Sequence, residues 1–263
     1  MTSPLFLLLV AAAAAVGAAM NSIAGGGTLI TFPALIALGV PPITANATST
    51  VALWPGSMAS MWGYRAELTG ARRWAIAFAV PSLLGGVTGA LLLLRTPEQR
   101  FAAIVPWLIL GATALFIAQK PLMRLILAAA PTRRDITAAD GTLDAPASAY
   151  LVFQFMVGVY GGYFGAGAGI LMLASLGLMG LTNIHQMNGL KNWGGGVMNF
   201  AAVVIFSLSG VVNWRIAAAM AVGATLGGIG GSLMAQRVGQ LWVRRGIVAI
   251  GLGSGLAMLF GLI

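Results

Sequence analysis

The chain has 263 residues, of which 59% are hydrophobic and 7% are charged, whereas about 25% of residues in a soluble domain are charged. This composition indicates an integral membrane protein and excludes an ordinary soluble domain. The net charge of +9 could suggest nucleic-acid binding, but the basic residues lie at the ends of apolar runs and form no patch interleaved with aromatics. Because the chain has no cysteine, disulfides, thiolate metal sites and thiol catalysis are excluded.

Long apolar runs predict membrane-spanning helices, because about 20 residues of α-helix cross the hydrocarbon core of a bilayer. In chain order, these runs are 4–24, 44–64, 72–94, 101–118, 184–208, 213–235 and 242–262. Three further runs, at 28–38, 150–164 and 168–179, are too short to cross alone. Strand-like alternation of polar and apolar residues is absent, so we expect an all-α integral membrane fold.

The two halves of the chain align when the sequence is shifted by about 140 residues, which indicates an internal repeat. The run from Asn21 to Thr28 meets the glycine-rich run 161–169, and Arg73-Trp74 meets Trp214-Arg215. Each half then has a glycine-broken pair of segments, re-entrant or discontinuous, followed by three spanning helices. We predict a single membrane domain with repeat one at 4–118, a polar connector at 119–149 and repeat two at 150–263.

The distribution of basic residues decides how the repeats are oriented, because cytoplasmic loops are enriched in lysine and arginine. If each broken pair enters and leaves on one side, the loops at 65–73 and 237–245 and the connector are all cytoplasmic, with most of the fourteen lysines and arginines. Parallel repeats would follow if each broken pair crossed once. We prefer inverted repeats, which place both termini outside a bacterial inner membrane.

Lys191 is the only formal charge deep inside an apolar run, and every Asp and Glu falls in a polar connection. A charge near the bilayer centre costs about 2.5–3.5 kcal/mol on insertion scales, so it persists mainly where it faces a cavity or a partner. Since no carboxylate is available to pair with it, we predict that its partner is a transported anion. The alternative is a lysine that snorkels to the interface, although its stem would have far to reach.

Glycine breaks offer a second kind of anion-binding group. Gly25, Gly26 and Gly27, followed by Thr28, would expose free backbone N–H groups and the positive end of a helix dipole. The matching break at Gly165/Gly167/Gly169 would supply a second such end. The alternative for transmembrane glycines is close helix packing, which we expect for Gly85/Gly89 and Gly223/Gly227.

Polar side chains follow each break at the same depth. Each of these side chains could form its hydrogen bonds within its own helix or with a neighbouring helix. As a group around Lys191, however, they indicate a binding site. The predicted substrate-binding residues are Asn21, Gly25, Gly26, Gly27, Thr28, Asn46, Thr48, Ser49, Gly165, Gly167, Asn188, Lys191 and Asn192. No cofactor or metal site is predicted.

Several motifs follow one another along the chain: the run from Asn21 to Gly27, Pro33, the stretch 39–49, and 158–169 with Lys191-Asn192. In these motifs the chain resembles the TauE/SafE sulfite exporter family of membrane permeases. This resemblance covers nearly the whole chain. It implies transport of sulfur-containing oxyanions such as sulfite or organosulfonates, often outward, without identifying the substrate.

We therefore expect a secondary transporter, acting as an exporter by alternating access, with a small anionic substrate, a lipid bilayer around it and no nucleic-acid partner. A passive anion channel and an importer of a related small organic anion are the alternatives. A membrane-embedded enzyme is disfavoured, because Glu67 and Glu98 lie in connections and the single histidine, His185, has no evident partner. The sequence does not predict the oligomeric state.

Overall fold

A computed structural model describes residues 3–24, 27–63, 65–68, 71–129, 148–179, 181, 183–234 and 240–262. Every element within these ranges is a helix, so the expectation of an all-α fold is confirmed there. The elements are α1 (Pro4–Ala24), α2 (Thr28–Ala37), α3 (Pro42–Gly63), η1 (Arg65–Leu68), α4 (Arg72–Arg95), α5 (Glu98–Ala129), α6 (Ser148–Tyr163), α7 (Ala168–Leu178), α8 (Ile184–Ser209), α9 (Trp214–Met234) and α10 (Gln240–Leu259).

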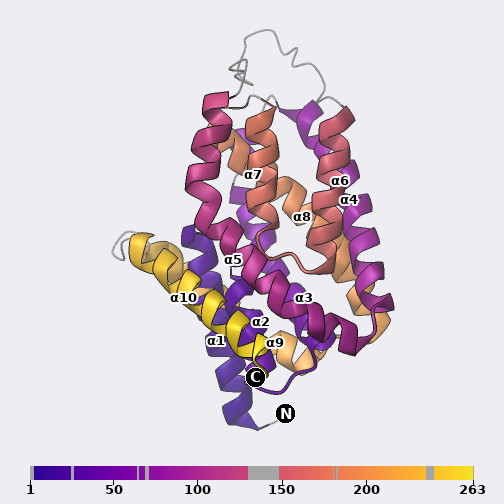
Figure 1. The fold of residues 1–263 in the computed structure, drawn as a ribbon, viewed down its shortest axis with the longest axis vertical. Coiled ribbons are helices and arrows are strands. Elements are labelled where there is room, and N and C mark those ends of the chain that lie inside the picture. The colour runs from indigo at the N-terminus through magenta and orange to yellow at the C-terminus, as the bar shows by residue number, and fades with distance from the viewer. Residues whose placement is uncertain are drawn as a thin grey trace.

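Helix α5 differs from its prediction. It continues to Ala129, so the first part of the predicted connector at 119–149 is helical. Pro121 lies inside the helix, and the apolar pattern continues through Leu125 and Ile126. Proline is tolerated inside helices of membrane proteins and kinks them. Figure 1 shows the change of direction along α5, which contains Pro106 and Pro121.

The surface of the helices is apolar. Within the described residues, Arg73–Arg95 and Glu98–Ile126 are each long and apolar enough to cross a membrane, with mean hydropathies of 2.0 and 2.2. On α4, Leu84 and Leu92 are 54% and 50% exposed. Soluble monomers rarely expose large contiguous apolar patches, so this surface suits contact with lipid.

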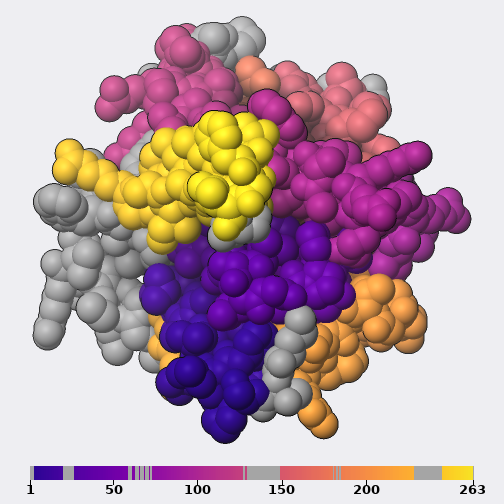
Figure 2. Space-filling view, turned by 60° about the horizontal axis from the view of Figure 1, so that its bottom comes forward, coloured from indigo at the N-terminus to yellow at the C-terminus, as the bar shows by residue number. Residues whose placement is uncertain are grey.

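Helices of the two halves pack against each other in a reciprocal way. The first helix of each half contacts the fourth helix of the other half, so α1 lies against α9 and α6 lies against α4. Helices α3 and α8 contact each other, as do α5 and α10. In Figure 1, α1 begins and α10 ends at the lower end of the molecule, whereas α5 ends and α6 begins at the upper end. Figure 2 shows α1, in indigo, and α10, in yellow, on the lower face.

Glycine makes these two helix contacts close. On α4, a Cβ at Gly85 would overlap the backbone of Gly158 in α6. On α9, Gly223 lies against the backbone of Ala11 in α1, and Gly227 lies against Ala15. The packing role expected for these glycines is therefore confirmed.

Replacing Gly89 by Ala should destabilise the fold, because the added Cβ would overlap the backbone of Val159 and Tyr163. Overpacking of this kind typically costs about 1–3 kcal/mol, so the unfolding temperature in detergent should fall. Gly253→Ala in α10 is the matched control, since no atom lies within 4 Å of where its Cβ would be. Equal unfolding temperatures for the two variants would contradict the close contact between α4 and α6.

Candidate functional site

The glycine break between α6 and α7 is a tight turn at residues 164–167. Gly165 and Gly167 have φ values of 84° and 80°, which residues with a Cβ rarely adopt. Both positions therefore favour glycine for conformational reasons. The hydroxyl of Tyr160 donates to the carbonyl oxygen of Ala166 at 2.6 Å and holds the turn against α6.

Backbone donors are only partly satisfied where α7 begins. The N–H groups of Ala168 and Ile170 donate to the carbonyl oxygens of Gly165 and Gly167, at 3.2 and 2.9 Å. The Gly169 N–H has no acceptor in the part of the chain that the structure describes. A helix start with a free donor attracts negative charge, because the helix dipole is positive at that end.

Lys191 of α8 lies against this helix start. A Cβ on Gly169 would be 3.3 Å from Cδ of Lys191, so the absence of a side chain at Gly169 leaves room for the lysine stem. The Lys191 Nζ donates to Oδ1 of Asn188 at 3.1 Å, one turn earlier on α8. Asn188 is neutral and leaves the lysine charge uncompensated. The carboxylate of Glu98 instead accepts the Ile43 N–H, at 2.9 Å.

Asn46 reaches the same break from the first half of the chain. Its Nδ2 donates to the carbonyl oxygen of Tyr163 at 3.0 Å, which satisfies one of the carbonyls left without a partner at the end of α6. The Asn46 side chain is 1% exposed, and its Oδ1 has no partner among the described residues. The break is therefore flanked by Asn46 at the end of α6 and by Lys191 at the start of α7.

Two other predicted residues of α3 lie elsewhere. Ser49 Oγ is 2.9 Å from Thr31 Oγ1 on α2, and the Thr31 hydroxyl lies 3.3 Å from the Gly27 carbonyl oxygen that it donates to. Ser49 is thus close to the first break. Thr48 Oγ1 accepts the Asn213 N–H at 3.0 Å and so holds the start of α9.

The first break is described only in part. Gly25 and Gly26 lie outside the described residues, as does the side chain of Asn21. Gly27 and Thr28 open α2, and Gly27 has a φ of −55°, an ordinary right-handed value. Position 27 therefore does not need glycine for its backbone conformation.

The predicted site residues thus fall into separate groups. Gly165, Gly167, Asn188, Lys191 and Asn46 are at or beside the second break, whereas Gly27, Thr28 and Ser49 are at the first. Asn192 follows Lys191 on α8 and is half-buried.

Three polar residues were not predicted from the sequence: Tyr160, beside the second break, and the pair Gln154 on α6 and Ser82 on α4. Gln154 and Ser82 are fully buried, and Gln154 Nε2 donates to Ser82 Oγ at 2.8 Å. One signal was present, because Gln154 is a lone carboxamide in an apolar run between Leu151 and Val157.

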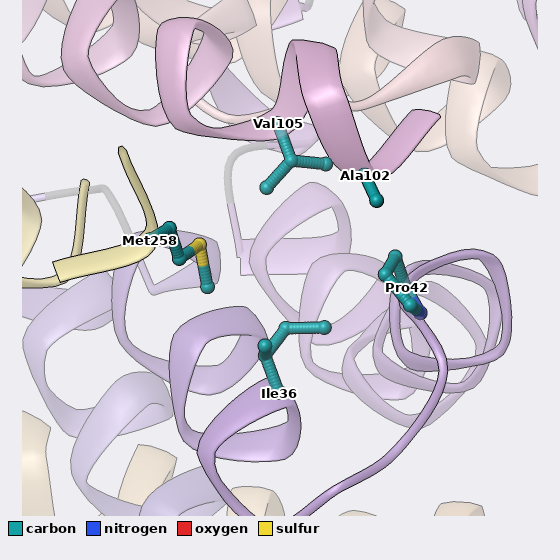
Figure 3. A pocket seen from close by; sticks show the side chains of 5 residues that line it. All are labelled: Ile36, Pro42, Ala102, Val105 and Met258. Carbon is teal, nitrogen blue, oxygen red and sulfur yellow. The ribbon is translucent and has the colours of Figure 1, made fainter. Parts of the chain in front are cut away.

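A pocket of about 220 Å³ lies away from these polar groups, between the ends of α2 and α10 and the starts of α3 and α5. Figure 3 shows the side chains that line it: Ile36, Pro42, Ala102, Val105 and Met258. An oxyanion needs hydrogen-bond donors or positive charge, and these side chains offer neither. The pocket is therefore not the candidate anion site.

A helical fold with apolar exposed faces and a part-buried lysine beside a helix break is typical of a membrane protein with an internal polar site. Residues 9–258 match the family described as sulfite exporter TauE/SafE, and the chain belongs to that family. It is a multi-pass membrane transporter.

Three curated relatives are each described as a probable membrane transporter protein. The chain is 30% identical to one from Haemophilus influenzae over 241 residues, which cover 87% of this chain and 85% of the relative. It is 28% identical to a Sinorhizobium protein over 255 residues, with coverages of 94% and 90%. It is also 28% identical to an Escherichia coli K12 protein over 257 residues, with coverages of 95% and 88%. No solved structure matches the chain significantly.

Proposed function

We propose that the protein is a secondary transporter that exports sulfur-containing oxyanions, such as sulfite or organosulfonates, by alternating access. The observation that carries the proposal is the position of Lys191, whose hydrogen-bond partner is the neutral Asn188 and whose stem lies against Gly169. A lysine in this position offers a full positive charge beside the free N–H of a helix start. Both groups stabilise a small oxyanion.

The first break takes part in the same transport cycle. The start of α2 at Gly27 and Thr28 offers a second positive helix end, where the N–H groups of Ile30 and Thr31 donate to the Gly27 carbonyl oxygen. Ser49, hydrogen-bonded to α2, corresponds in the repeat to Lys191. With a lysine in only one half, the anion is bound nearer the second break.

Reciprocal packing supports inverted repeats as the basis of alternating access. Helix α1 packs closely on α9, and α6 packs closely on α4. Each unit that moves as a rigid body therefore contains helices from both halves of the chain. The first helix of each half moves with the fourth helix of the other half, and the contact between α3 and α8 changes. Moving one charge across 100 mV is worth about 2.3 kcal/mol, so a negative interior drives an anion outward without a coupling ion.

Uptake into proteoliposomes tests the proposed function. Labelled sulfite, organosulfonates and carboxylates would be offered at an imposed membrane potential of either sign. We expect saturable transport of the sulfur oxyanions, with counterflow, and faster movement away from the negative side. Transport without saturation or counterflow would identify a passive channel. Faster transport of the carboxylates than of the sulfur oxyanions would contradict the proposed substrate class.

Cysteine labelling tests the predicted topology, and the chain is suited to it because it contains no cysteine. A cysteine at Arg134 or Gly239 should react with an impermeant reagent only from the cytoplasm, since most basic residues segregate there. A cysteine at Thr2 should react only from outside. Labelling of Gly239→Cys from outside would rule out inverted repeats.

A further inference from the structure

Gln154 of α6 has a free hydrogen-bond acceptor in the interior of the protein. Ser82 Oγ donates its single hydrogen to the carbonyl oxygen of Phe78, at 2.6 Å. It can therefore only accept from Gln154, whose Nε2 lies 2.8 Å away. This arrangement fixes the orientation of the carboxamide, so the atom without a partner among the described residues is the carbonyl oxygen Oε1. Gln154 is 0% exposed.

This free oxygen belongs to a side chain near the lysine. A Cβ on Gly194 of α8 would be 3.4 Å from Gln154 Nε2 and 3.2 Å from Ser82 Oγ. Gly194 lies one helical turn from Lys191 along α8. Asn46, at the other side of the second break, has the same pattern, with its nitrogen used by the protein and its oxygen free. Unused acceptors thus occur beside Gly194, one turn from Lys191 on α8, and at the end of α6 on the other side of the break.

Lys191 and the α7 N–H groups are donors, and they match the oxygens of an oxyanion. No described donor reaches Gln154 Oε1, and a buried polar group without a partner is costly to keep. A ligand that satisfies both kinds of group is an anion that also carries a hydrogen-bond donor. Hydrogen sulfite and hydroxylated sulfonates have this chemistry, whereas simple alkanesulfonates do not.

We propose that the anion held at Lys191 carries an O–H or N–H group, and that the carboxamide oxygen of Gln154 accepts its hydrogen bond. Gln154 is then a residue that determines specificity within the oxyanions. This inference rests on the proposed function, because it assumes that Lys191 binds the transported anion.

The test compares anions that differ mainly in the donor: 2-hydroxyethanesulfonate with ethanesulfonate, and hydrogen sulfite with methanesulfonate. Affinity is measured by thermal stabilisation of the purified full-length protein in detergent. We expect the unmodified protein to prefer the donor-bearing member of at least one pair by about tenfold to a hundredfold. Gln154→Met, which keeps the shape and leaves the hydroxyl of Ser82 bonded to Phe78, should remove this preference.

Ser175→Ala is the matched control, because Ser175 is also fully buried and its hydroxyl has no partner among the described residues. This variant should keep the preference of the unmodified protein. Equal affinities within both pairs, or a preference that survives in Gln154→Met, would overturn the inference while leaving anion transport intact. A preference that requires sodium would assign Oε1 to a cation and also overturn it.

The two proposals fail in distinguishable ways. If no anion of either pair stabilises the unmodified protein, or if Lys191→Met is stabilised as strongly, the proposed site itself is wrong, whatever Gln154 does. If the variant Gln154→Met does not fold, Gln154→Leu supplies the same comparison.

Discussion

Replacing Lys191 by Met should abolish binding of the anion while leaving the protein folded. The lysine charge is uncompensated within the described residues, since its hydrogen-bond partner Asn188 is neutral. Removing one partner of a buried charge pair costs about 3–5 kcal/mol, which corresponds to an affinity loss of at least a hundredfold. The ligand-free protein should keep its unfolding temperature or gain stability, because a charge has been taken out of an apolar environment.

Thermal unfolding in detergent measures both effects at once. At a ligand concentration of about 100 times Kd, a bound anion stabilises the native state by roughly 2.7 kcal/mol. The Lys191→Met variant should show no such shift. Lys191→Arg should keep part of the affinity with altered selectivity, because a planar guanidinium matches an oxyanion differently from an ammonium. A Lys191→Met variant that the anion stabilises as strongly as the unmodified protein would make the lysine structural.

Replacing Gly167 by Ala should impair binding through the backbone. A residue with a Cβ in the left-handed region costs about 1–2 kcal/mol, so the turn at Gly167, with a φ of 80°, should shift. Steric overlap is not the cause, since the nearest atoms, on Ala112, are 3.6 Å from the added Cβ. A shifted turn moves the N–H groups at the start of α7, and the affinity for the anion should fall about tenfold or more.

Gly210→Ala is the matched control for this backbone effect. Gly210 ends α8, has a φ of 76° and has no atom within 4 Å of its Cβ position. Both variants should lower the unfolding temperature by similar amounts, but only Gly167→Ala should weaken binding. Equal affinities of the two variants for the anion would show that the turn at the second break has a structural role only and does not contribute to anion binding.

Much of the fold could be predicted from the sequence, because a membrane leaves few choices. Backbone groups in lipid must be satisfied within a helix, so a long apolar run predicts a helix and its limits closely. The error in α5 has the same origin, since a proline such as Pro121 ends helices in water but is tolerated in membranes.

The site could be predicted only in part. Lys191 could be identified from the sequence alone, because the energetic cost of its charge is large wherever the chain folds. Contacts between the halves could not be predicted. Asn46 and Tyr163 are 117 residues apart, and Thr48 and Asn213 are 165 apart. Aligning the two repeats shows which residues are equivalent in the two halves. It does not show which residues are in contact, because equivalent residues need not touch each other.

The reciprocal packing also has a consequence for biosynthesis. Helix α1 inserts first, yet the residues that it packs against most closely, such as Gly223 beside Ala11, are more than two hundred positions later in the chain. At about 5–20 residues per second, the ribosome needs roughly ten to forty seconds to supply them. During that interval the small-residue face of α1 is available to other partners, so a chain that stalls before α9 should be a substrate for membrane quality control rather than a folded half.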